Sequence, residues 1–216
     1  MPHTELCSMR FALSYNHFTK TPFWVVERLQ AKNLLGTANR KFSNFKSDPR
    51  LEKESQARLA DYRGSGYDRG HMAPAGDLKS SQIAMDESFY LTNIAPQVGV
   101  GFNRGIWRQL EEKVRGWVLE RGELYIITGP VYYDYSPVIG EGRVVVPDAF
   151  FKIIYDPRTF EALTFLLPNQ AFSKTSLKKF QITIDDLESR VGVDFFNDLS
   201  PALEAALELS SSLLWP

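Results

Sequence analysis

The sequence is poor in cysteine and histidine, and it contains no long apolar run. Cys7 is the single cysteine among 216 residues, so an internal disulfide is excluded, and three histidines leave no cluster with the spacing of a structural zinc site. A membrane-spanning helix would need about 18 or more consecutive apolar residues, and none are present. The first residues also lack the basic and apolar regions of a signal peptide. We therefore expect a soluble chain with no membrane segment and no zinc scaffold.

The chain also lacks a strong net charge, which is −1 at pH 7. This balance argues against a protein that coats nucleic acid through bulk electrostatics. The charges are unevenly distributed, however: residues 28–71 carry ten Lys or Arg against five Asp or Glu, whereas residues 185–216 carry seven acids against Arg190 alone. Two solvated faces of opposite sign account for this division, and the alternative is a basic groove in the first half that meets a polyanion.

What is present is an ordinary globular composition, with 44% hydrophobic and 13% aromatic residues. The length suits one domain with a substantial core, so we expect residues 1–216 to fold as one unit. Strands are predicted where short apolar or β-branched runs lie between turn residues, and the first two should form an antiparallel pair. The predicted strands cover residues 9–15, 23–26, 89–94, 124–128, 144–146, 150–155 and 162–167.

Helices are expected between these strands. From Asn103, apolar residues recur every three or four positions, which predicts an amphipathic helix. A capping box at Thr183 predicts a second helix through Val191, and Pro201 has the position of a first helical residue. Residues 36–66 show no apolar period, which predicts a long irregular connection with short helical pieces. A connection of this length in a compact domain is usually functional or disordered.

One short stretch combines three chemical groups. Arg69, Gly70 and His71 follow one another after a Gly-Ser-Gly turn, and His71 should lie on a strand or at its end. A guanidinium can contact phosphate oxygens, an imidazole can accept a proton near neutral pH, and the glycine lets the backbone approach whatever both face. Asp68 should point to the opposite strand face from Arg69, which indicates a hydrogen-bonding role in the scaffold.

The helix that begins at Asn103 supplies oxygen ligands. Asn103 offers an amide oxygen, and Glu111 lies on the same broad face two turns later. With space for water molecules, these two side chains suit Mg²⁺, which prefers oxygen ligands. His71 need not bind the metal, because its reference pKa of about 6.5 makes it a natural base for attacking water. We expect His71 and Asn103 to face each other across a small cleft.

Three motifs in order carry a resemblance to a known family. They are DRGHMAP at residues 68–74, TNIAPQ at residues 92–97 and NRGIW at residues 103–107, the last followed by Leu110 and Glu111. Together they resemble the DNA/RNA non-specific endonucleases, which include secreted bacterial nucleases and mitochondrial endonuclease G. Weaker likenesses extend over nearly the whole chain. The resemblance implies the ββα-metal fold, an α+β architecture with a central antiparallel sheet flanked by helices.

The resemblance also implies roles for individual residues. His71 would be the general base for in-line attack of water on phosphorus, and Arg69 would stabilise the charged transition state. Asn103 would be the only direct protein ligand of one Mg²⁺, with Mn²⁺ as an alternative ion, and Glu111 would contact the metal through water. Products with 5′-phosphate ends follow if the metal lies on the leaving 3′ oxygen.

Further positions are matched less tightly. The upstream active-site arginine of the family corresponds to Arg40, although the local spacing also allows a match at Ser43. Arg104 and Arg108 are either phosphate contacts or ordinary charges on the helix surface. Asn93 matches a recurrent position near the metal, where it binds substrate or only shapes the cleft through hydrogen bonds.

The predicted function is a Mg²⁺-dependent, sugar-non-specific endonuclease acting on DNA and RNA. The alternative from another class is a nucleic-acid-binding module of the same fold without the chemistry. A serine esterase does not fit, because Gly64-Ser65-Gly66 is not a Gly-x-Ser-x-Gly motif. Since a general nuclease would harm its own cell, we expect export, compartmentation or an inhibitor protein, and a homodimer is an open alternative to a monomer.

Overall fold

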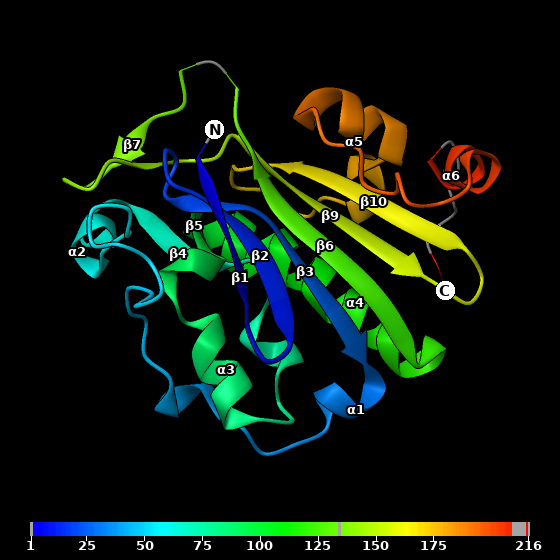
Figure 1. Cartoon of the computed structure of the whole chain (residues 1–216), viewed down its shortest axis with the longest axis horizontal. Helices are drawn as coiled ribbons and strands as arrows, with labels where there is room; N and C mark the ends of the chain where they lie inside the picture. The colour runs from blue at the N-terminus through cyan, green and yellow to red at the C-terminus, as the bar shows by residue number, and fades with distance from the viewer. Residues whose placement is uncertain (1, 134, 209–214, 216) are drawn as a thin grey trace.

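An antiparallel sheet forms the centre of the protein. The computed structural model describes residues 2–133, 135–208 and 215. Within that part of the chain, seven strands pair in the order β1-β2-β3-β6-β9-β10-β11, and every pair is antiparallel (Figure 1). The strands are β1 (His3–Cys7), β2 (Phe11–Asn16), β3 (Thr21–Gln30), β6 (Glu123–Val131), β9 (Ala149–Asp156), β10 (Glu161–Pro168) and β11 (Gln181–Ile182).

Helices cover both faces of this sheet, as Figure 1 shows. The α-helices are α1 (Ala31–Leu34), α2 (Leu59–Tyr62), α3 (Gln82–Ser88), α4 (Arg108–Arg121), α5 (Ile184–Val191) and α6 (Pro201–Glu208). Short helical turns are η1 (Arg40–Phe42), η2 (Ala75–Asp77), η3 (Leu91–Asn93) and η5 (Leu177–Phe180). None of the described helices has the length and apolarity needed to cross a membrane. The predicted α+β class, with an antiparallel sheet flanked by helices, is confirmed.

Strand alternation divides the core between the two sheet faces. On β9, Phe150 and Ile154 pack on the side of α4, whereas Phe151 and Ile153 pack on the side of α5 and α6. Successive side chains of a strand point to opposite faces, which explains why β9 is buried almost throughout. The α4 side also holds α3 and the segment that contains Met72. This larger layer carries the candidate site.

A small two-stranded sheet, the β4–β5 sheet, contains the short Arg-Gly-His stretch. Strand β4 (Tyr67–His71) pairs with β5 (Ile94–Val98), so that His71 lies opposite Ile94 and ends its strand as predicted. A Cβ on Gly70 would lie 2.1 Å from the Cδ atom of Gln97, so the side chain of Gln97 occupies the space that any larger residue would need. Glycine is therefore required at position 70 so that the Gln97 side chain can pack against the backbone of β4.

The predicted strand at residues 89–94 is wrong. These residues end α3 and form η3, and the strand begins at Ile94 and includes Pro96. The aromatic and apolar content of the segment reflects burial instead, because Phe89 and Leu91 are both core residues. Most other predictions of elements are confirmed, including the irregular connection at 36–66 and the cap of α5, where the Thr183 hydroxyl accepts a hydrogen bond from the Asp186 amide at 3.0 Å.

The segment η4 (Gly99–Trp107) joins β5 to α4 and is irregular, with a non-helical backbone at Gly105. The helix predicted to begin at Asn103 therefore begins at Arg108 instead. Gly101 has a φ of +86°, and a Cβ there would lie 2.9 Å from the Cβ of Ala171, so only glycine fits this turn without strain. Asn169 anchors the same region: its side chain accepts from the Val98 amide at 2.9 Å and donates to the carbonyls of Pro96 and Pro147 at 3.1 and 2.9 Å. Residues that follow β10 thus hold the approach to α4 in place.

We predict that Asn169→Ala destabilises the protein. The substitution removes three hydrogen bonds and leaves backbone groups of β5 and the loop before β9 without partners, which should lower the free energy of unfolding by about 1–3 kcal/mol. Urea denaturation monitored by circular dichroism measures this loss. Gln170→Ala, at the exposed neighbouring position, is the control, and equal stability of the two variants would contradict the anchoring role.

Candidate active site

A cleft of about 670 Å³ opens between β4, η1, η4 and the first turns of α4. Among the described residues, five arginines and three carboxylates line this cleft, so a negatively charged ligand would meet an excess of positive charge. Most of the residues predicted from the sequence lie in its wall: Arg40, Arg69, His71, Asn103, Arg104, Arg108 and Glu111. The structure thus brings together groups that are up to 71 positions apart in the chain.

His71 lies in an aromatic setting on the cleft wall. Its ring centroid is 5.2 Å from that of Phe45 and 4.8 Å from that of Phe89. The Nε2 atom is buried and has no hydrogen-bond partner within the described part of the chain. Burial, together with the smaller effect of the positive charges of Arg40 and Arg69, lowers the pKa of His71 to about 3. His71 is therefore neutral at pH 7 and able to accept a proton.

The same two aromatic rings hold the guanidinium groups. The Cζ atom of Arg69 lies 4.4 Å from the centroid of Phe45, and that of Arg40 lies 5.8 Å from the centroid of Phe89. A cation is attracted to the face of an aromatic ring at such distances. Sequence reasoning did not include Phe45 in the site, because it lies in the irregular connection and no periodic pattern marks it.

Asp68 connects the β4–β5 sheet to η4. One carboxylate oxygen accepts a hydrogen bond from the Asn103 amide nitrogen at 2.9 Å, and the carboxylate also pairs with Arg104 at 2.9 Å. Because an ionised carboxylate only accepts hydrogen bonds, Asn103 must present its NH₂ group to Asp68, which leaves its Oδ1 atom for another ligand. Asp68 was predicted to form hydrogen bonds in the scaffold, and its contact shows which one: it sets the orientation of the Asn103 amide.

Glu111 enters the cleft from the first turn of α4. Burial raises the pKa of its carboxyl group to about 7, opposed by the positive charges of Lys152 and Arg115 and reinforced by Asp77. Glu111 forms no hydrogen bond or ion pair with the other described residues that would occupy its oxygens. Its carboxylate is therefore available to a ligand in the same cleft as Asn103.

The remaining arginines differ in how firmly they are held. Arg108 pairs with Glu112 at 3.0 Å on the surface of α4, and both side chains are more than half exposed. Arg115 was not predicted; its guanidinium donates to buried Asp77 at 2.8 Å and also lines the cleft. The helical spacing of four residues from Glu111 was the signal that could have identified it.

Asn93 lies outside the wall of the cleft. Its side chain is fully buried, accepts a hydrogen bond from the Ala73 amide at 2.9 Å, and donates to the carbonyls of Ala73 and Ser88 at 3.0 and 2.9 Å. These bonds use both N–H groups and one acceptor position of the amide oxygen. They favour the second of its two predicted roles, in which Asn93 shapes the cleft through hydrogen bonds, because they fix the chain just after His71.

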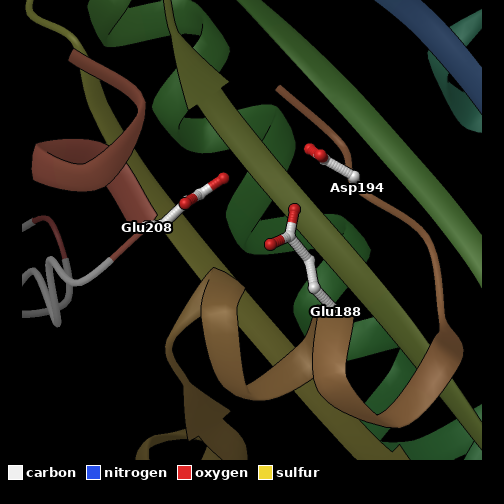
Figure 2. A group of neighbouring side chains, drawn as sticks. All are labelled: Glu188, Asp194 and Glu208. Atoms are coloured by element: carbon white, nitrogen blue, oxygen red, sulfur yellow. The ribbon is translucent and has the colours of Figure 1, made fainter. Parts of the chain in front are cut away.

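An acidic cluster lies on the other face of the sheet. Figure 2 shows Glu188, Asp194 and Glu208 with their carboxylates directed toward one another, and the oxygens lie within 4.8 Å. Glu188 already accepts a hydrogen bond from the Phe195 amide at 2.7 Å. Glu188 lies on α5, Glu208 on α6 and Asp194 between them, and both helices pack on the face opposite α4. The cluster is therefore separate from the cleft.

We predict that Glu111→Gln stabilises the metal-free protein at high pH. The folded-state pKa of about 7 exceeds the ordinary value of 4.5, so the folded protein binds more protons and loses stability as pH rises between these values. With allowance for partial solvent exposure, the variant should be about 1–2 kcal/mol more stable than wild type at pH 8 and equal to it near pH 4.

Urea unfolding in the presence of a chelator, at a series of pH values, measures this difference. Glu112→Gln, at the exposed neighbouring position, is the matched control and should show no such pH-dependent gain. A Glu111→Gln protein that is less stable than wild type at pH 8 would contradict the raised pKa.

Comparison with known proteins gives one answer throughout. The profile of the DNA/RNA non-specific endonucleases matches residues 3–202. Nuclease C1 from Cunninghamella echinulata var. echinulata is 39% identical over 204 residues, covering 88% of this chain and 81% of the relative, and mitochondrial endonuclease G from Caenorhabditis elegans is 38% identical over 207 residues, covering 88% and 67%.

A solved structure supports the same relationship. The crystal structure described as the EndoG/EndoGI complex contains a chain that is 35% identical to this one, with a TM-score of 0.87 over 91% of this chain and 86% of the other. Its agreement with the present fold confirms the predicted ββα-metal architecture, in which β4 and α4 line the cleft and β5 pairs with β4. The chain belongs to the DNA/RNA non-specific endonuclease family and is a nuclease.

Proposed function

We propose that this nuclease is a Mg²⁺-dependent, sugar-non-specific endonuclease that cleaves DNA and RNA to 5′-phosphate ends. The observation that carries the proposal is the convergence of His71, Asn103 and Glu111 in one arginine-lined cleft. The lining groups are charged and suited to phosphates, whereas sequence is read through base edges. Weak base preference and action on both sugars follow from this chemistry.

His71 acts as the general base in this proposal. Neutral imidazole takes a proton from water as the water oxygen attacks phosphorus and the bond from phosphorus to the 3′ oxygen breaks. A pKa of about 3 would make a weak base, but a bound phosphodiester adds negative charge close to His71 and offsets Arg40 and Arg69. Substrate binding therefore raises the pKa of His71 toward the working range.

Arg69 and Arg40 stabilise the charge that develops on the phosphate oxygens. Their stacking on Phe45 and Phe89 limits the movement of the guanidiniums before substrate arrives, and preorganised charge is effective in a site that excludes water. Arg104 and Arg108 lie at the cleft with more than half of each side chain exposed, so their surface ion pairs are weak and open to exchange for phosphate contacts.

The donor set fits Mg²⁺. Asp68 engages the NH₂ group of Asn103 and leaves its Oδ1 atom for a ligand, and the Glu111 carboxylate has no hydrogen-bond or ion-pair partner among the described residues. An amide oxygen and a carboxylate are ligands that Mg²⁺ accepts while it keeps several waters, so Asn103 would bind directly and Glu111 through water. When bound, the ion supplies positive charge to the leaving 3′ oxygen. Mn²⁺ accepts the same ligands.

Partners and location are part of the proposal. The similar solved structure is described as a complex concerned with EndoG inhibition, which supports an inhibitor protein for this nuclease too. Relatives from Saccharomyces cerevisiae and Caenorhabditis elegans are named as mitochondrial, which supports compartmentation. A homodimer remains a prediction.

We predict that His71→Ala lowers the rate of plasmid nicking and RNA degradation by a factor of about 10²–10⁴, because the water loses its proton acceptor. A chelator should abolish activity, and added Mg²⁺ should restore it. His17→Ala is the control, since His17 bonds to Thr4 at 2.8 Å and does not line the cleft. Equal activity of His71→Ala and wild type would refute the mechanism, and salt-sensitive binding without cleavage by wild type would favour a binding module.

A further inference from the structure

Three polar residues interrupt the apolar face of the sheet beneath α4. Glu27 on β3, Thr128 on β6 and Lys152 on β9 lie on adjacent strands and face the same layer as the core residues Val25, Ile126 and Ile154 of these strands. Each is at most 3% exposed. Charged side chains are almost never fully buried unless they are paired, so this arrangement requires an explanation.

Lys152 is held at the centre of the group. Its Nζ atom donates a hydrogen bond to the Thr128 hydroxyl at 2.5 Å and lies 5.1 Å from the centroid of the Trp107 ring. Trp107 is the last residue of η4, and α4 begins at the next position. The ammonium group is therefore fixed between the sheet and the start of the helix that carries Glu111.

Charged groups from several elements face this ammonium. Burial lowers the pKa of Lys152, and the carboxylates of Glu27, Glu111 and Asp77 oppose that shift, while Arg115 adds to it. Burial raises the pKa of Glu27 well above its ordinary value, and its Oε2 atom has no partner in the described residues. Lys152 thus faces the buried carboxylates of Glu27 and Asp77 and the half-buried carboxylate of Glu111. Trp107, whose ring its ammonium group contacts, lies four residues before Glu111.

The carboxylates are not equivalent in what they contact. Asp77 accepts a direct ion pair from Arg115, whereas Glu111, one turn before Arg115 on α4, pairs with no described cation within ion-pair distance. A direct ion pair would occupy the oxygens that a ligand needs. A buried charge at longer range stabilises a carboxylate without occupying those oxygens, because electrostatic attraction acts over distance in a poorly solvated interior.

We propose that Lys152 is a positioning residue for Glu111: it supplies the buried positive charge that holds this carboxylate at the cleft floor while leaving its oxygens free for a ligand. The inference rests on the proposed function, in which Glu111 helps to hold Mg²⁺. It assigns to the sheet, through Thr128 and Trp107, the task of placing that charge.

The test begins with Lys152→Met, which keeps the length of the side chain and removes its charge. We expect kcat to fall at least about tenfold with KM for nucleic acid within about twofold, and Mg²⁺ binding by calorimetry, without substrate, to weaken by at least about tenfold. Lys113→Met is the matched control, since Lys113 lies exposed on α4 outside the cleft. Unchanged kcat and Mg²⁺ affinity in Lys152→Met would overturn the proposal.

A second variant separates positioning from folding. Removal of one buried charge leaves the opposite charge uncompensated, which destabilises the fold of Lys152→Met by itself. Glu27→Gln combined with Lys152→Met removes both charged groups. We expect the double variant to keep the circular dichroism spectrum and cooperative unfolding of wild type and still to show reduced kcat and weaker Mg²⁺ binding. A well-folded double variant with wild-type kcat would overturn the proposal.

A double-mutant cycle with Glu111→Gln identifies the group through which Lys152 acts. If Lys152 acts through Glu111, Lys152→Met should change kcat by less than about twofold in the Glu111→Gln background. If Lys152→Met lowers kcat by the same factor in the wild-type and Glu111→Gln backgrounds, the proposal is overturned. Failure of the proposed function has a different signature, namely no cleavage by wild type, or full activity of Glu111→Gln.

Discussion

The hydrogen bond between Asp68 and Asn103 is the interaction on which the site depends. Asp68 lies on β4 and Asn103 lies in η4, so this contact connects the strand that contains His71 with the segment that leads into α4 and Glu111. It also fixes which atom of the Asn103 amide faces the cleft. The predicted base and the predicted metal ligands come from separate elements, and Asp68 links these elements.

The surroundings of these groups impose an electrostatic cost that the fold tolerates. His71 is kept neutral by burial and by two arginines, and Glu111 is held in a poorly solvated wall. Both arrangements disfavour the charged form of the group. Perturbed groups of this kind cluster at functional sites.

Much of the site could be predicted from sequence because its principal residues lie in short, ordered motifs. His71 and Arg69 are two positions apart on one strand, and Asn103 and Glu111 share one short motif, although the helix predicted between them begins only at Arg108. Their roles in catalysis stay predictions. Phe45 could not be identified, since only tertiary packing brings the irregular connection to His71.

The fold was predicted less evenly. The strands of the central sheet follow from their apolar runs, but the run that contains Lys152 gave no indication that a charged side chain would face the core. The segment before β5 was assigned to a strand because burial and sheet pairing favour the same residue types. Sequence pattern reports burial, and it does not specify the partner that buries a residue.

Because Asn169 and Ala171 support the region around η4, the part of the chain that contains the motifs cannot be separated from the residues that follow β10. The segment from β4 through η4 to α4 is continuous in the chain, which suggests a unit that could be transferred between proteins. However, the conformation of the loop that contains Asn103 depends on residues about 70 positions later. If the β4–β5 sheet and α4 were transplanted alone, the motifs would be present, but the residues that give η4 its conformation would be missing. Recombination between relatives would therefore have to exchange both segments together.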